Sequence, residues 1–139
     1  MDWEECNKRA LVKETKIDEN LIKSLLKTSE NKLKSFNRLE LDSVTASTKV
    51  SLFYDCLREL LEALAIKNKY KIYNHECFAS FLKEILEDNF LAFEFDRFRK
   101  IRNGINYYGK EISIDNVKTL IREMQNVRNK ILEKYFKND

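Results

Sequence analysis

The sequence predicts an all-α fold, an antiparallel helical bundle of four to five helices. The chain of 139 residues contains no proline and only two glycines, so few residues would interrupt a helix. Hydrophobic residues also recur every three or four positions through several long segments, which is the period of an amphipathic helix. Hydrophobic residues make up 43% of the chain, which is too high a fraction for a disordered protein. This length predicts a single domain over residues 1–139.

Composition argues against several classes of protein. The net charge of +3, from 26 basic and 23 acidic residues, lacks the strong basic excess of many nucleic-acid-binding domains. The three cysteines, Cys6, Cys56 and Cys77, are odd in number and form no Cys-x-x-Cys pair. We therefore expect no disulfide framework and no zinc site. Unpaired cysteines are typical of a reducing compartment, so we expect a cytoplasmic location. No apolar run approaches the length of a membrane span, so no membrane association is expected.

The first half of the chain predicts an N-terminal extension and one long helix. Residues 1–16 are expected to form a short helical turn around Trp3 and Cys6, followed by an extended piece. The first long helix should begin after Asp18, which is a favourable N-cap residue. A segment rich in Ser and Thr, residues 39–48, then ends this helix because such side chains compete for backbone groups. The hydrophobic residues on one side of this helix are Ile22, Leu25, Leu26, Leu33 and Phe36.

The middle of the chain contains the most regular helical pattern. Its hydrophobic positions are Val50, Phe53, Tyr54, Leu57, Leu60, Leu61 and Leu64, which repeat at three and four residues without a break. The opposite face carries polar residues, including Asp55, Arg58, Glu59 and Glu62. Residues 67–74 form a basic, aromatic connector, and Asn74 is expected to cap a third helix that contains Phe78 and Phe81.

Two more helices are predicted in the last third of the chain. The fourth runs from about Asp88 to Gly109, which occupies the position of a glycine that terminates a helix. Ser113 should cap the fifth. Gly104 lies inside the fourth helix, where glycine costs about 1 kcal/mol relative to alanine. Because it follows Arg102 by two residues, we interpret it as a position where another backbone or a ligand approaches closely.

One stretch in this region resembles a known family. The sequence "IRNGINYYGKEI", residues 101–112, places an Arg-Asn pair near the end of a long helix, followed by a short spacer and two tyrosines before the last helix. This arrangement is similar to the HEPN domain. Residues 54–82 add to the resemblance through an amphipathic helix, a Lys-x-Tyr-Lys connector and an Asn-His-Glu helix start. The resemblance covers about residues 18–136.

The resemblance implies a bundle of four or five helices that usually forms a homodimer. Many members of the HEPN family are RNases that need no metal and use an Arg-x(4–6)-His motif in a cleft at the dimer interface. Other members bind nucleotides or RNA without cleaving them. Some form a toxin–antitoxin pair with a small nucleotidyltransferase. No cofactor is implied.

Carried onto this sequence, the motif gives Arg102 and Asn103 as its first two residues. Tyr107 stands where the family has histidine, and Tyr108 follows it. Histidine titrates near neutral pH and suits proton transfer, whereas tyrosine, with a pKa near 10, does not. Arginine binds phosphate through a planar fork of donors, and tyrosine can stack on a base. We therefore expect a nucleotide- or RNA-binding protein in which the motif for metal-independent endoribonuclease activity is incomplete.

Simpler interpretations remain open for each of these residues. Arg102 and Asn103 could belong to an ion pair at a helix end, with Asp55 or Glu59 as the partner of Arg102. His75, the single histidine, is expected to have a structural role at the start of the third helix. The whole chain could be a helical protein–protein interaction module without a ligand.

The fourth helix supports the expected homodimer. Its aromatic residues cover more than one side of the helix, which leaves one face for a partner. These residues are Phe90, Phe93, Phe95 and Phe98.

Overall fold

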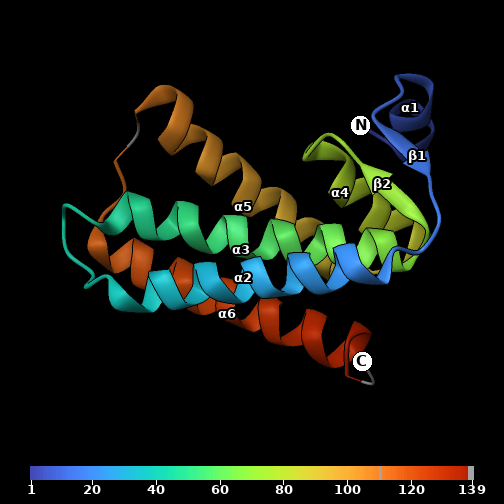
Figure 1. Cartoon of the computed structure of the whole chain (residues 1–139). Helices are drawn as coiled ribbons and strands as arrows, with labels where there is room; N and C mark the ends of the chain where they lie inside the picture. Colours follow the sequence, from blue (N-terminus) through green and yellow to red (C-terminus); the bar gives the residue numbers. More distant parts are fainter. Residues whose placement is uncertain (110, 138–139) are drawn as a thin grey trace.

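The computed structural model describes residues 1–109 and 111–137 and confirms the all-α class. Its described part consists of six α-helices, one π-helical turn and two short strands (Figure 1). In chain order these are α1 (Trp3–Lys8), β1 (Val12–Glu14), α2 (Glu19–Arg38), α3 (Ala46–Lys67), β2 (Tyr70–Ile72), α4 (Glu76–Ser80), η1 (Phe81–Ile85), α5 (Asn89–Tyr108) and α6 (Ile114–Tyr135).

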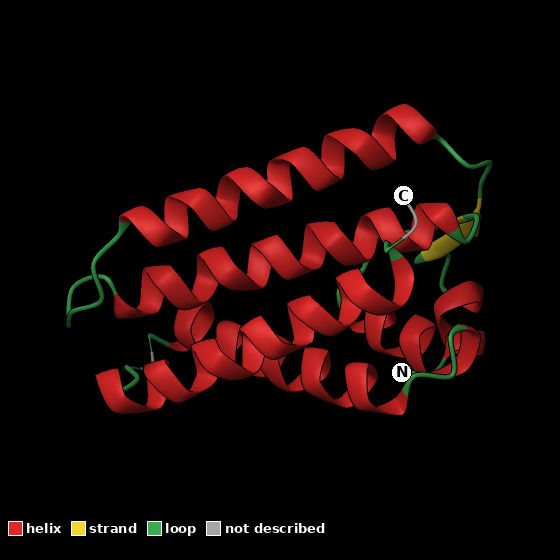
Figure 2. Ribbon diagram, turned by 90° about the horizontal axis from the view of Figure 1, so that it is seen from below, coloured by secondary structure: helices red, strands yellow, loops and turns green. Residues whose placement is uncertain are grey.

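Helix α3 is the centre of the structure. It contacts α2, α5, α6 and β2, and its sequence is apolar on more than one side because these neighbours cover it from different directions. Figure 1 shows α2 and α6 running beside α3, while α5 diverges from α3 toward its own C-terminal end. Figure 2 shows the long helices from below, with the small strand pair at one end. No helix in the described residues is long and apolar enough to cross a membrane.

Local sequence signals set three helix ends as predicted, at Asp18, Ser113 and Gly109. The expected cap at Asn74 differs, because His75 occupies the N-cap position of α4 and Asn74 accepts a hydrogen bond from the Glu76 amide at 2.8 Å. The Asp18 carboxylate accepts a hydrogen bond from the Leu21 amide at 3.0 Å, and the Ser113 hydroxyl accepts one from the Asn116 amide at 3.2 Å. Gly109 has φ of 60° and ends α5 in the left-handed conformation, which glycine adopts without the strain of a Cβ atom.

Asp88 connects the start of α5 to the end of α6. Its Oδ1 accepts from the Leu91 amide at 3.1 Å, and its Oδ2 accepts from Lys134 Nζ at 3.0 Å and the Tyr135 hydroxyl at 2.9 Å. Burial alone would raise the pKa of the Asp88 carboxyl, but these hydrogen bonds outweigh burial and lower it. The three contacts fix where α5 begins and hold that end of α5 to the end of α6.

The structure corrects the prediction of a plain connector at residues 67–74. Strand β2 pairs antiparallel with β1, with Val12 opposite Ile72 and Glu14 opposite Tyr70. In β2, Tyr70 and Ile72 alternate with the exposed Lys71, a pattern that suits a half-buried strand. The sequence did not reveal the pairing because β1 belongs to the N-terminal extension, far away along the chain.

The structure also contradicts the expectation that no disulfide forms. Cys6 and Cys77 form a disulfide bond, with their Cα atoms 6.1 Å apart, and both residues are fully buried. Cys56 remains a buried free thiol. The bond forms because α1 folds against α4, which brings together cysteines separated by 71 residues. The expected cytoplasmic location rested on unpaired cysteines and loses that support.

Reduction of this disulfide should destabilise the protein by about 2–4 kcal/mol, because the bond closes a long loop in the unfolded chain. Urea denaturation of the wild type with and without a reductant measures the difference. The variant Cys56→Ala is the matched control and should show the same sensitivity to reductant. A wild type that is equally stable oxidised and reduced would contradict the disulfide.

Candidate functional site

Arg102 of α5 packs on Tyr54 of α3. Its guanidinium carbon lies 5.3 Å from the centroid of the Tyr54 ring, within the range of a cation–π contact. Its Nη2 lies 3.9 Å from Asp55 Oδ1, and only 18% of the side chain is exposed. Ser51 and Asn106 add a second link between α3 and α5 through a 3.3 Å hydrogen bond. The structure thus brings Arg102 to Asp55, one of the two partners considered from the sequence.

One donor of the Arg102 guanidinium lacks an acceptor in the described part of the chain, and the contact of this guanidinium with Asp55 is long. At 3.9 Å the contact with Asp55 is an ion pair but too long for a hydrogen bond. The Nε atom is buried and has no hydrogen-bond partner among the described residues. Asp55 also lies 3.9 Å from Arg58 Nε, so one carboxylate faces two guanidinium groups. An arginine carries five N–H donors, and buried donors without partners are rare in proteins.

Tyr54 is the rigid platform beneath this arginine. Its side chain is fully buried and stacks on Phe95, with ring centroids 5.2 Å apart and planes 17° apart. Its hydroxyl lies 3.0 Å from His75 Nδ1. Burial raises the pKa of the Tyr54 phenol, although Arg102, Arg99 and Arg58 act in the opposite direction. Tyr54 therefore stays neutral and joins Arg102 to His75.

His75 precedes the first residue of α4 and is half-buried. Burial, together with the positive charges of Arg58, Arg102 and Arg99, lowers the pKa of His75 to about 4, while Asp55 opposes the shift. The imidazole is therefore neutral near pH 7. The sequence predicted a structural role at this helix start, and His75 does occupy that start. What the sequence did not predict is the contact with Tyr54, because the two residues belong to different elements.

The two other arginines near His75 are better satisfied than Arg102. Arg99 donates to Asp96 through Nε at 3.0 Å, and its Nη2 lies 3.6 Å from Glu76. Arg58 is hydrogen-bonded to Glu62. We use the name Arg102 cluster for Tyr54, Asp55, Arg58, His75, Arg99 and Arg102.

The other site residues predicted from the sequence are Asn103, Tyr107, Tyr108 and Glu59. Asn103 is half-buried directly after Arg102. Tyr107 and Tyr108 form the last turn of α5, and their side chains lie outside the part that the structure describes. Glu59 is not the partner of Arg102. It faces α2, where it pairs with Lys32 and accepts a 2.7 Å hydrogen bond from Thr28, because α2 packs along that side of α3.

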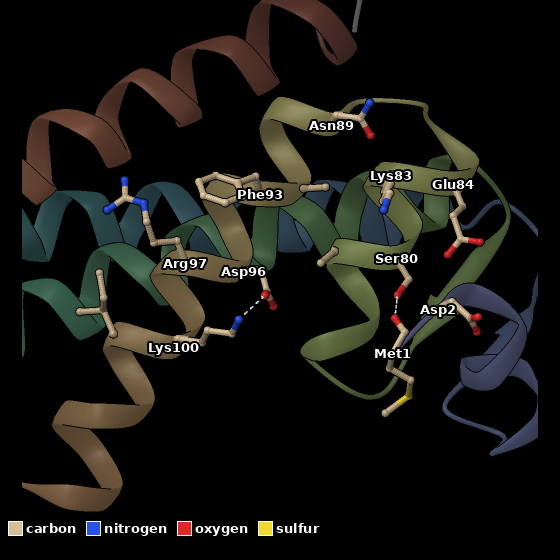
Figure 3. Close-up of a pocket in the computed structure, with 13 residues that line it drawn as sticks. Met1, Asp2, Ser80, Lys83, Glu84, Asn89, Phe93, Asp96, Arg97 and Lys100 are labelled. Carbon is tan, nitrogen blue, oxygen red and sulfur yellow. Dashed lines mark hydrogen bonds and ion pairs between the residues drawn. The ribbon is translucent and has the colours of Figure 1, made fainter.

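A groove between the N-terminus and α5 is a second place where a ligand could bind (Figure 3). Its basic side chains on α5 are already paired: Lys100 lies 3.2 Å from Asp96, and Arg97 lies 2.6 Å from Glu94. Met1 closes one side through a hydrogen bond from Ser80. The described residues contain no group of three or more His, Cys, Asp or Glu side chains that could hold a metal ion. The Arg102 cluster is the better candidate because Arg102 Nε is buried without a hydrogen-bond partner among the described residues.

Comparison with protein-family models, with curated proteins and with solved structures found no match to this chain. No relative therefore assigns a role to any of these residues.

Proposed function

We propose that this chain is a HEPN-like protein that binds a phosphate group of RNA or of a nucleotide at the Arg102 cluster. The observation that carries the proposal is the guanidinium of Arg102, which is largely buried and has a buried Nε without a hydrogen-bond partner among the described residues. A phosphate oxygen is a strong acceptor that matches the fork of arginine donors. The Arg-Asn motif that resembles HEPN points to the same residue.

The charges around Arg102 favour an anion. Arg58 and Arg102 share the carboxylate of Asp55 at 3.9 Å each. Arg58 has Glu62 as a second acidic partner, whereas Arg102 pairs with Asp55 alone among the described residues. A charged group that is partly removed from water interacts more strongly with an ion of opposite charge than it would in bulk solvent. Asp55 thus holds Arg102 in position while leaving its donors for a ligand.

Binding, rather than cleavage, is the proposed activity. Tyr107 stands at the position of the catalytic histidine in the resemblance, and a phenol with an ordinary pKa is a weak base at neutral pH. We propose that Asn103, Tyr107 and Tyr108 contribute contacts to the sugar, base or phosphate, in keeping with the stacking of single-stranded bases on aromatic side chains.

We further propose a homodimer and a nucleotidyltransferase as partners. The dimer proposal is supported by α5, on which Phe90 is 47% exposed and Phe93 is 69% exposed while Phe95 and Phe98 are buried. Large apolar side chains that remain exposed on one helix face are typical of an interaction surface. The nucleotidyltransferase rests on the HEPN resemblance alone.

Substitution of Arg102 should weaken RNA binding. We expect Arg102→Ala to reduce the affinity for a short single-stranded RNA by about 10- to 100-fold, because hydrogen bonds to charged groups contribute about 1.5–3 kcal/mol. Arg102→Lys should also bind more weakly, since an ammonium does not replace the bidentate fork. Fluorescence anisotropy with a labelled oligonucleotide at fixed salt measures both effects.

Arg128 provides a matched control for this experiment. Its side chain is 20% exposed and pairs with Glu30, and its Nε is likewise buried without a partner among the described residues. Arg128→Ala removes an equally buried arginine charge outside the Arg102 cluster and should leave RNA affinity unchanged. Equal loss of affinity in both variants would mean that general charge, rather than the cluster, binds the RNA. Absence of binding by the wild type would favour the interaction module without a ligand.

Restoring histidine at the motif tests the proposed loss of catalysis. The variant Tyr107→His should gain metal-independent RNase activity, because an imidazole that titrates near neutral pH then stands five residues after Arg102. Cleavage of a fluorogenic RNA in the presence of a chelator measures it, with Tyr107→Phe as the control. If Tyr107→His binds RNA and remains inactive, the site lacks more than the histidine.

The dimer has its own test. Light scattering should give about twice the 16.6 kDa mass of one chain, and Phe93→Glu should shift the protein toward the monomer by placing a charge on the exposed apolar face. Asn116→Glu, at an exposed position of α6, adds the same single negative charge elsewhere and should leave the dimer intact. A monomer at every practical concentration would end this proposal.

A further inference from the structure

We propose that His75 is the proton-binding residue of the Arg102 cluster: an oxyanion bound beside Arg102 draws a proton onto His75, and the resulting imidazolium helps to hold that oxyanion. The inference rests on the proposed phosphate site and adds to it a residue, a proton and a dependence on pH. It does not require RNA cleavage.

The geometry connects His75 to the site through one side chain. The Tyr54 hydroxyl lies 3.0 Å from His75 Nδ1, and Arg102 lies against the ring of the same tyrosine, 5.3 Å from its centroid. The His75 and Tyr54 ring centroids are 5.8 Å apart. Because Tyr54 is fully buried, it cannot move away from either neighbour without disturbing the core.

The second ring nitrogen of His75, Nε2, is the atom that we propose contacts the oxyanion. No hydrogen bond to Nε2 occurs among the described residues, whereas Nδ1 is occupied by Tyr54. In the imidazolium both ring nitrogens are donors. Protonated His75 would thus donate through Nδ1 to the Tyr54 oxygen, and Nε2–H would remain to donate to an oxyanion.

The charged and titratable groups around His75 explain why His75 would become protonated only when an anion is bound nearby. Helix α3 contributes Tyr54, Asp55 and Arg58, with Glu62 paired to Arg58. Helix α5 contributes Arg99 and Arg102, with Asp96 paired to Arg99. Helix α4 contributes Glu76, which pairs with Arg99. Three guanidinium groups against the nearby carboxylate of Asp55 disfavour a further positive charge, and together with burial they lower the pKa of His75 to about 4. An oxyanion in the cluster would offset the arginine charges and raise that pKa.

The direction of the pH dependence follows from linkage. With the site empty, His75 gains its proton only near pH 4, and with the site occupied it gains the proton at a higher pH. Between these two values, binding takes up a proton, so the affinity for the anion rises as pH falls through this window. Above the pKa of the occupied state no proton is taken up, and the affinity no longer depends on His75.

Nuclear magnetic resonance can follow this proton directly, because His75 is the single histidine of the chain and its imidazole C–H signals need no assignment by mutation. The probe is inorganic sulfate, whose charge stays constant over this pH range, compared with chloride at equal ionic strength. We expect sulfate to raise the pKa of His75 by about one unit or more, which corresponds to about tenfold tighter sulfate binding to the protonated form.

Two variants separate this inference from the proposed function. In Arg102→Ala, sulfate should no longer move the His75 pKa. In His75→Gln, sulfate binding near neutral pH should persist, while the gain in affinity at acidic pH should disappear. Arg102-dependent sulfate binding with an unmoved His75 pKa would overturn the inference and leave the phosphate site standing. An unchanged pH dependence in His75→Gln would also overturn it. Absence of any Arg102-dependent sulfate binding would overturn both.

Discussion

The contact between the buried ring of Tyr54 and the guanidinium of Arg102 is the interaction on which the proposed site depends. Tyr54 has no exposed surface, so its position is set by the core, and Arg102 and His75 take their positions from it. A flexible arginine would lose side-chain freedom on binding a ligand, at a cost of about 0.5–1.5 kcal/mol. In this structure part of that freedom is already lost, which prepares the donors of Arg102 for an acceptor.

Two interactions outside the cluster hold α5, which carries Arg102, and α4, which His75 directly precedes. Asp88 holds the first turn of α5 to Lys134 and Tyr135 at the end of α6, so α5 is held at the end opposite Arg102. The Cys6–Cys77 disulfide holds α4 to the N-terminal helix, only two residues after His75. Helices α4 and α5 are therefore each anchored outside the Arg102 cluster, and the contacts within the cluster are not the only ones that hold these two helices in place.

Signals that lie within one segment could be predicted from the sequence, whereas pairings between segments could not. Asp18, Ser113 and Gly109 mark helix ends because a capping side chain or a left-handed glycine acts on its own backbone neighbours. The β1–β2 pairing and the Cys6–Cys77 bond each join residues far apart along the chain, and neither strand carries a turn signal that points to its partner.

The same distinction applies to the candidate site. Arg102 could be singled out because its motif is local. Asp55 and Glu59 could not be told apart as its partner, since residues four apart share one helix face. The two side chains point in slightly different directions around the axis of α3, so Glu59 contacts α2 and Asp55 contacts α5. A structural role was predicted for His75 because its position at the start of a helix is visible in the local sequence. Its contact with Tyr54 forms only when α4 packs near α3, which the local sequence does not show.

The central claim is that the Arg102 cluster is built to bind an oxyanion, and a crystal structure of the protein with a short RNA tests it most directly. The account predicts a phosphate whose oxygens lie about 3 Å from the Arg102 guanidinium and from His75 Nε2, with Tyr54 unmoved beneath them. An RNA bound elsewhere, with Arg102 turned into a bidentate hydrogen-bonded pair with Asp55, would contradict it.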